Sequence, residues 1–98
     1  MNIQAMMKQA QKLQKEMMNS KNEIDEMEFT GKSSFVTVTI KGTKEIKEVK
    51  IDNESLDKDE IEMLEDMILV ATNDAMKQVD KITEEKMGKY TQGIPGLF

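Results

Sequence analysis

The first 27 residues repeat an apolar pattern with a period of seven. Two rows of positions have this spacing, and seven of their eight residues are apolar. The rows are Ile3, Ala10, Met17 and Ile24, and Met6, Leu13, Ser20 and Met27. The stretch contains no glycine or proline, and most of its other residues favour helices. The pattern predicts one long helix of about 35 Å, with a narrow apolar seam that faces a partner helix.

Residues 27–51 change to the alternating pattern of half-buried strands. The alternating apolar residues are Val36, Val38 and Ile40. We expect a turn over residues 41–44, in which Gly42 is free to take a positive φ, and a return strand over 45–51. Ile46 is out of phase with the later apolar residues of that strand, which predicts a bulge. With a short strand near 27–30, the segment predicts a three-stranded antiparallel sheet.

A second helical pattern begins near Asp57. Asp57 and Glu60 have the spacing of a capping box, and the acids around them suit the positive end of a helix dipole. Apolar residues then recur every three or four positions along one face, and the helix is expected to continue to about Lys89. They are Ile61, Leu64, Ile68, Ala71, Ala75, Val79 and Ile82.

These elements predict one α+β domain over residues 1–92: a long N-terminal helix, a three-stranded antiparallel sheet and a long C-terminal helical region. Residues 93–98, with the sequence GIPGLF, follow as an apolar tail. Two long amphipathic helices carry more apolar surface than so small a sheet can cover, so we expect a homodimer. Its seam on the first helix is predicted to consist of Ile3, Met6, Ala10, Leu13, Met17 and Ile24.

The composition removes several classes of function. The 98 residues include no His, Cys or Trp, so the usual zinc ligands, the thiol nucleophile and the commonest general base are missing. No apolar run approaches the length of a membrane span, and the first residues do not resemble a secretory signal. The usual parts of an enzyme are therefore missing, and we expect a protein that is not an enzyme and uses no metal, cofactor, small-molecule substrate or membrane.

The formal net charge of −5 conceals alternating blocks of charge. Residues 1–15 carry three lysines and no acid, and residues 31–51 carry five lysines and two glutamates. Residues 16–30 have a net charge of −4, and residues 52–66 have a net charge of −7. Local basic blocks in an acidic protein are still able to meet a polyanion.

The lysines of the first helix leave three interpretations open. Lys8, Lys12 and Lys15 lie within about 60° of one another, opposite the apolar seam. They are placed to hold a phosphate backbone, or they only keep a coiled coil soluble while it scaffolds partner proteins. A membrane-surface helix over residues 1–18 is the weakest of the three, because the apolar seam is narrow and interfacial tryptophan is missing.

Five segments carry a resemblance to a known family. They are MKQAQKLQKEM at 7–17, MEFTGKSSFVTVTIKG at 27–42, VKIDNESL at 49–56, EMLEDMILVATNDAMKQ at 62–78 and EKMGKYTQGIPGLF at 85–98. In this order they resemble the YbaB/EbfC family of bacterial nucleoid-associated proteins. The resemblance implies a cytoplasmic, tweezers-like homodimer of α+β subunits, whose projecting helices bind double-stranded DNA and alter its conformation in nucleoid organisation and gene regulation.

The resemblance also points to regions for DNA contact. The family's binding is attributed to the first helix and the C-terminal helical region. The lysines in these regions are Lys8, Lys12, Lys15, Lys77, Lys81, Lys86 and Lys89. The chain departs from many members at Lys32-Ser33-Ser34, where they have a glycine-rich stretch. Because no residue set is aimed at base edges, we expect low sequence specificity.

Overall fold

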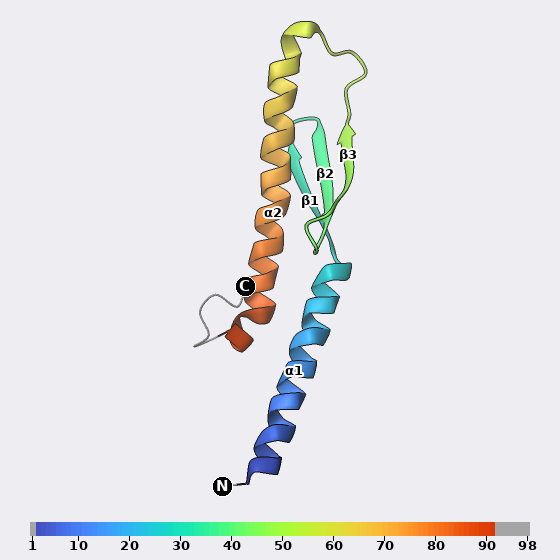
Figure 1. Ribbon diagram of the computed structural model, residues 1–98. Coiled ribbons are helices and arrows are strands. Elements are labelled where there is room, and N and C mark those ends of the chain that lie inside the picture. Colours follow the sequence, from blue (N-terminus) through green and yellow to red (C-terminus); the bar gives the residue numbers. More distant parts are fainter. Residues whose placement is uncertain (1, 92–98) are drawn as a thin grey trace.

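The computed structural model describes residues 2–91, and it confirms the predicted α+β fold. The elements in chain order are α1 (Ile3–Glu26), β1 (Glu28–Ser33), β2 (Val36–Lys41), β3 (Ile46–Ile51), the short 3₁₀ helix η1 (Lys58–Glu60) and α2 (Ile61–Thr91). The sheet is antiparallel in the order β1-β2-β3. Figure 1 shows α2 along one face of the sheet, with α1 projecting from one end of the sheet. The predicted tail over 93–98 lies outside the described residues.

The core lies between α2 and the sheet. Small residues at helical spacing on α2 let the helix approach β1 and β2 closely. The buried core residues are Phe29, Val36, Val38, Ile40, Ala71, Ala75 and Val79. Leu64, Ile68 and Ile82 pack against this cluster as predicted, whereas Ile61 is 52% exposed.

Two glycines are required by close backbone contacts. A Cβ added to Gly31 would lie 1.9 Å from the Ala71 carbonyl oxygen, so only glycine lets α2 sit on β1 at this distance. A Cβ on Gly42 would lie 1.7 Å from the Ile24 carbonyl oxygen. In the turn over residues 41–44, Lys44 rather than Gly42 takes the left-handed conformation, with a φ of 72°.

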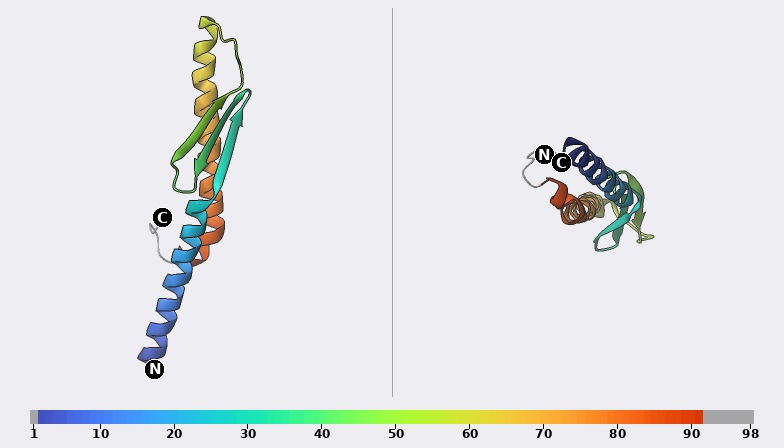
Figure 2. Two further views of the ribbon diagram at one scale, coloured as in Figure 1. Left: turned by 90° about the vertical axis from the view of Figure 1, so that its right-hand side faces the viewer. Right: turned by 90° about the horizontal axis from the view of Figure 1, so that it is seen from below.

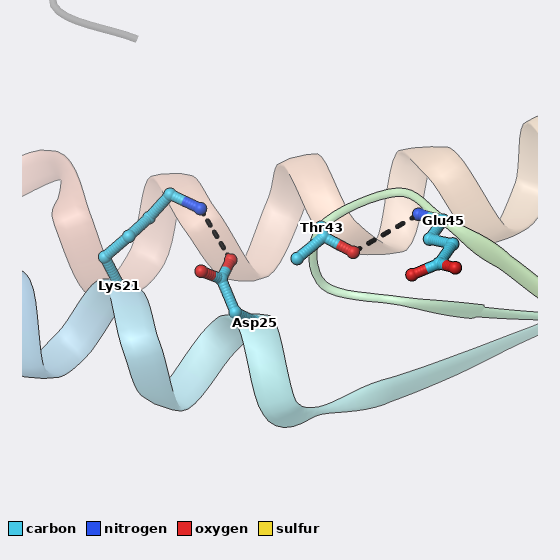
Figure 3. Close-up of polar contacts among 4 residues, drawn as sticks. All are labelled: Lys21, Asp25, Thr43 and Glu45. Carbon is cyan, nitrogen blue, oxygen red and sulfur yellow. Dashed lines mark hydrogen bonds and ion pairs between the residues drawn. The ribbon is translucent and has the colours of Figure 1, made fainter.

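The ends of the strands agree only partly with the sequence pattern. The predicted bulge is confirmed, because the β2–β3 register shifts between Thr39 and Ile40. In the turn before β3, the Glu45 amide donates to Thr43 Oγ1 (Figure 3). The predicted capping box is not formed, because the Asp57 side chain makes no capping hydrogen bond and the chain enters α2 through η1 instead.

The two edges of the sheet differ. At the β1 edge, side chains of α2 pair with backbone groups of the strand. Gln78 Nε2 donates to the Thr30 carbonyl over 2.8 Å, and the Lys32 amide donates to Asp74 over 3.4 Å. The β3 edge lies beyond α2, and all six β3 residues are exposed. An open edge of this kind is a surface that proteins usually cover or charge.

Only the last part of α1 packs against the rest of the subunit. Ile24 is 1% exposed. Met17 and Met18 line a groove of about 190 Å³ with Met87 of α2. Residues 3–16, which we name the arm, make little contact with β1–β3 and α2, which we name the body (Figure 1). The arm begins at Asn2, whose side chain caps the helix by accepting from the Ala5 amide.

Candidate nucleic-acid interface

Three lysines lie on the exposed side of α1. Lys8, Lys12 and Lys15 are all exposed, and none lies within ion-pair distance of a carboxylate in the described part of the chain. At 100° per residue they lie roughly opposite Met17 and Ile24, which face the body. The three ammonium groups therefore point away from the rest of the subunit, where an anion can approach them.

The predicted seam is divided between two environments. Ile3, Met6 and Leu13 are 69%, 54% and 49% exposed, and Ala10 is exposed as well. Ile24, by contrast, is already buried inside its own subunit and has no surface left for a partner. Within one subunit, the apolar row of the arm is therefore the part of the seam that stays available.

The lysines of α2 do not share one face. Lys77 and Lys81 lie one turn apart on the side of α2 away from the core residues. Lys86 turns the other way, and its Nζ lies 4.0 Å from a Glu23 carboxylate oxygen of α1. The Lys89 ammonium lies 5.0 Å from the centroid of the Tyr90 ring. The fold thus separates these four candidates instead of bringing them together.

Acidic side chains lie between the α1 lysines and the sheet, and ion pairs balance part of their charge. Lys21 Nζ lies 2.6 Å from Asp25, one helical turn away (Figure 3). Lys47 Nζ lies 3.0 Å from Glu28, across the sheet. Exposed pairs of this kind add little stability, but they weaken the negative field where α1 meets β1.

The sheet carries a second set of basic residues that the sequence analysis did not identify as a site. Side chains alternate between the two faces of a strand, so the face away from α2, which we name the outer face, can be read from the register. It consists of Glu28, Thr30, Lys32, Thr37, Thr39, Lys41, Glu48 and Lys50. The signal in the sequence is the basic block over 31–51, but strand register is needed to place its lysines side by side.

Charge is distributed unevenly along the molecule. The acidic segment over 52–66 includes the β3–α2 connection, η1 and the first turns of α2. Figure 1 shows this region at the opposite end of the molecule from the start of α1, and the principal extents are 71 × 22 × 14 Å. A polyanion is therefore attracted to the arm and repelled from the far end.

The described residues contain no group of three or more His, Cys, Asp or Glu side chains placed to hold a metal ion. In the same part of the chain, no helix has the length and apolar character needed to cross a membrane.

Comparison with known proteins identifies the family. The sequence profile of the YbaB/EbfC DNA-binding family matches residues 1–94. The chain is 47% identical over 97 residues to a nucleoid-associated protein of Lactococcus lactis subsp. cremoris, covering 97% of this chain and 98% of the relative. It is 44% identical over 99 residues to a nucleoid-associated protein of Ligilactobacillus salivarius, covering 99% and 95%. The chain therefore belongs to the YbaB/EbfC DNA-binding family.

Proposed function

We propose that this protein binds double-stranded DNA in the bacterial nucleoid, within the cytoplasm, as a homodimer of low sequence specificity. Membership of a DNA-binding family supports the choice of partner, and the names of its relatives support the location. The observation that carries the proposal is the row of three exposed lysines on a projecting helix, none of which pairs with a carboxylate within residues 2–91.

The lysines act by neutralising phosphates. Each phosphate contact releases condensed counterions, so affinity falls as salt rises. Three lysines on each arm give six in a dimer, and full engagement corresponds to a log-affinity against log-salt slope of about −5. The α2 lysines Lys77 and Lys81 lie on the side of α2 away from the core residues and are not counted in this slope.

Low specificity follows from the chemistry of the basic residues. All 14 of them are lysines, and arginine, which reads guanine through two parallel hydrogen bonds, is absent. Lysine on an exposed helix acts as a flexible point charge and carries little sequence information.

The homodimer is supported by the apolar surface that a single subunit leaves exposed. On the arm this surface includes Ile3, Met6 and Leu13. A second area lies on β3 and the first half of α2. Its exposed residues are Ile46, Val49, Ile51, Ile61, Met63, Leu69 and Val70. So many exposed apolar side chains in a chain of this length are typical of a protein interface. Two arms in one dimer can grip a duplex at two points, which gives a means of altering its conformation and a role in nucleoid organisation and gene regulation.

This function requires no catalytic group, cofactor or small-molecule substrate, and we propose none. Family membership favours DNA over the alternative of a coiled-coil scaffold for other proteins. The apolar seam is compatible with both DNA binding and protein scaffolding, so experiments on the lysines, rather than on the seam, distinguish the two functions.

A salt-dependent titration of a fluorescent duplex tests the proposal. The wild-type protein is expected to give a slope near −5, and Lys8→Glu with Lys12→Glu is expected to reduce it to about −2 because two of three contacts per subunit are lost. Both positions lie off the seam, so light scattering should still report a dimer. Lys44→Glu with Lys58→Glu is the matched control, because it changes the charge equally at two lysines that are not expected to contact DNA. Lys44 is paired with Asp80, and Lys58 lies in the acidic segment over residues 52–66.

Two results would overturn the proposal. Absence of any duplex binding by the wild-type protein at low salt would favour the scaffold alternative. A double variant that binds as tightly as the wild type would remove the α1 lysines from the mechanism.

A further inference from the structure

We infer that the outer face of the sheet is a second phosphate-contacting surface, which holds the same duplex as the α1 lysines. This inference rests on the proposed function, and it adds a site that neither the first helix nor the C-terminal helical region provides. Its central row is Lys32, Thr37 and Lys50, which are direct neighbours across β1, β2 and β3.

The outer face is entirely polar. Its eight side chains are lysines, threonines and two glutamates, whereas the opposite face carries the valines and isoleucines of the core. A face without a large apolar or aromatic side chain offers little to a protein partner or to a lipid surface. It also offers no platform for stacking on unpaired bases, so the ligand that fits is the backbone of a duplex.

The charge of the outer face is positive. Lys32, Lys41 and Lys50 are exposed, and within residues 2–91 none of them is ion-paired. Glu28 is engaged by Lys47, which leaves Glu48 as the unbalanced acid of the face. Strand spacing places Lys32 and Lys50 about 10 Å apart at their Cα atoms, with Thr37 between them. Two ammonium groups and a hydroxyl donor are the side chains that commonly bind phosphate oxygens.

The outer face and the α1 lysines point away from the same element. The core residues define the α2 side of the sheet, and the α1 lysines lie opposite the positions that pack on the body. In the left view of Figure 2 the sheet lies in front of α2, and α1 continues downward from the sheet. One duplex lying along this side would therefore meet both sets of lysines.

A third lysine extends the row at the β1 edge. Lys32 lines a hollow of about 510 Å³ with Asn73 and Lys77 of α2. The hollow also contains the Asp74 carboxylate, which accepts a hydrogen bond from the Lys32 amide. Lys32 thus connects the outer face with one of the α2 candidates, and it is the lysine whose loss should be felt most.

The test compares two double variants that remove the same charge. Lys32→Gln with Lys50→Gln removes the two ends of the row, and Lys44→Gln with Lys58→Gln removes two lysines elsewhere. All four side chains are exposed, so the fold should be retained. With a 30-base-pair duplex, the α1 lysines alone correspond to a slope of about −5, and four more contacts from the two outer faces would bring the wild-type slope to about −9. Lys32→Gln with Lys50→Gln should return the slope to about −5 and lower the affinity about tenfold per lost contact near 0.1 M salt. The control should match the wild type.

A second readout tests the surface directly. Adding the duplex should shift the backbone amide resonances of Thr37 and Thr39 in the wild-type protein, whereas a purely solvated face would leave them unchanged. Wild-type affinity and slope in Lys32→Gln with Lys50→Gln, while Lys8→Glu with Lys12→Glu loses binding, would overturn this inference and leave the proposed function standing. A wild-type protein that binds no duplex would overturn both.

Discussion

The body and the arm use apolar side chains in opposite ways. In the body, Val36, Val38 and Ile40 are 0% exposed because α2 covers them. In the arm, Ile3 and Met6 are 69% and 54% exposed, although they belong to an equally regular pattern. A helix as short as the arm is only marginally stable in water without packing. The comparison teaches that the body folds on contacts within one chain, whereas the apolar row of the arm has few such contacts and would gain them from the second subunit of the proposed dimer.

The largest effect is expected at the closest contact within the body. Gly31→Ala places a methyl group 1.9 Å from the Ala71 carbonyl oxygen and 2.7 Å from the Ala75 amide nitrogen, so the α2 backbone must move away from β1. We expect the free energy of unfolding to fall by about 3 kcal/mol. Urea unfolding followed by circular dichroism measures this change.

Gly88→Ala is the control for that variant. Gly88 lies within α2, and apart from its chain neighbours and the backbone of its own helical turns, no atom lies within 4 Å of a Cβ added there. Because alanine is the better helix former, the control should gain about 1 kcal/mol. Equal losses of stability in the two variants would contradict the assigned role of Gly31.

A smaller effect on stability, but a clear effect on assembly, is expected in the arm. Leu13→Glu places a charge on the exposed apolar row, where Leu13 is 49% exposed in the single subunit. The body should keep its fold, and the dissociation constant of the dimer should rise about ten- to a hundredfold, since the interface buries the exposed half of two Leu13 side chains, which together contribute about 1.5–3 kcal/mol. Light scattering over a dilution series measures the change, and urea unfolding of the body provides the second readout.

Gln11→Glu controls for the added charge, because Gln11 lies well off the seam at 100° per residue. A Leu13→Glu variant that dimerises like Gln11→Glu would show that the arm seam is not the dimer interface. The open β3 surface would then become the better candidate.

Periodicity predicted the elements well because each pattern depends on burial along one element. The heptad pattern predicted α1, and the alternation of Val36, Val38 and Ile40 predicted β2. Ile46, which is out of phase with the later apolar residues of its strand, predicted the bulge. What escaped prediction depends on contacts between elements. Position 42 requires glycine because the Ile24 carbonyl oxygen lies too close to leave room for a side chain, and no local sequence pattern reveals this contact.

The candidate site follows the same rule. The α1 lysines could be placed on one side from helical spacing alone, because all three belong to one helix. Lys32 and Lys50 are 18 positions apart in the chain, and only the register of three strands makes them neighbours. Lys77 and Lys86 are nine positions apart on α2, so helical spacing already places them on opposite sides of the helix. Only the ion pair between Lys86 and Glu23 depends on where α1 packs against α2.

The smallest effect is expected at the β1–β2 hairpin, where the body holds a strained residue. Ser34 has a φ of 54°, a left-handed conformation that glycine adopts without steric cost. Ser34→Gly should therefore raise the free energy of unfolding by up to about 1 kcal/mol, and Ser33→Gly should lower it by about 0.5–1 kcal/mol, because Ser33 is a strand residue. Urea unfolding of both variants gives the difference, and a loss of stability in Ser34→Gly would contradict the strain. Because the change is confined to the body, dimer dissociation should match that of the wild type, which separates the energetics of the body from those of the arm.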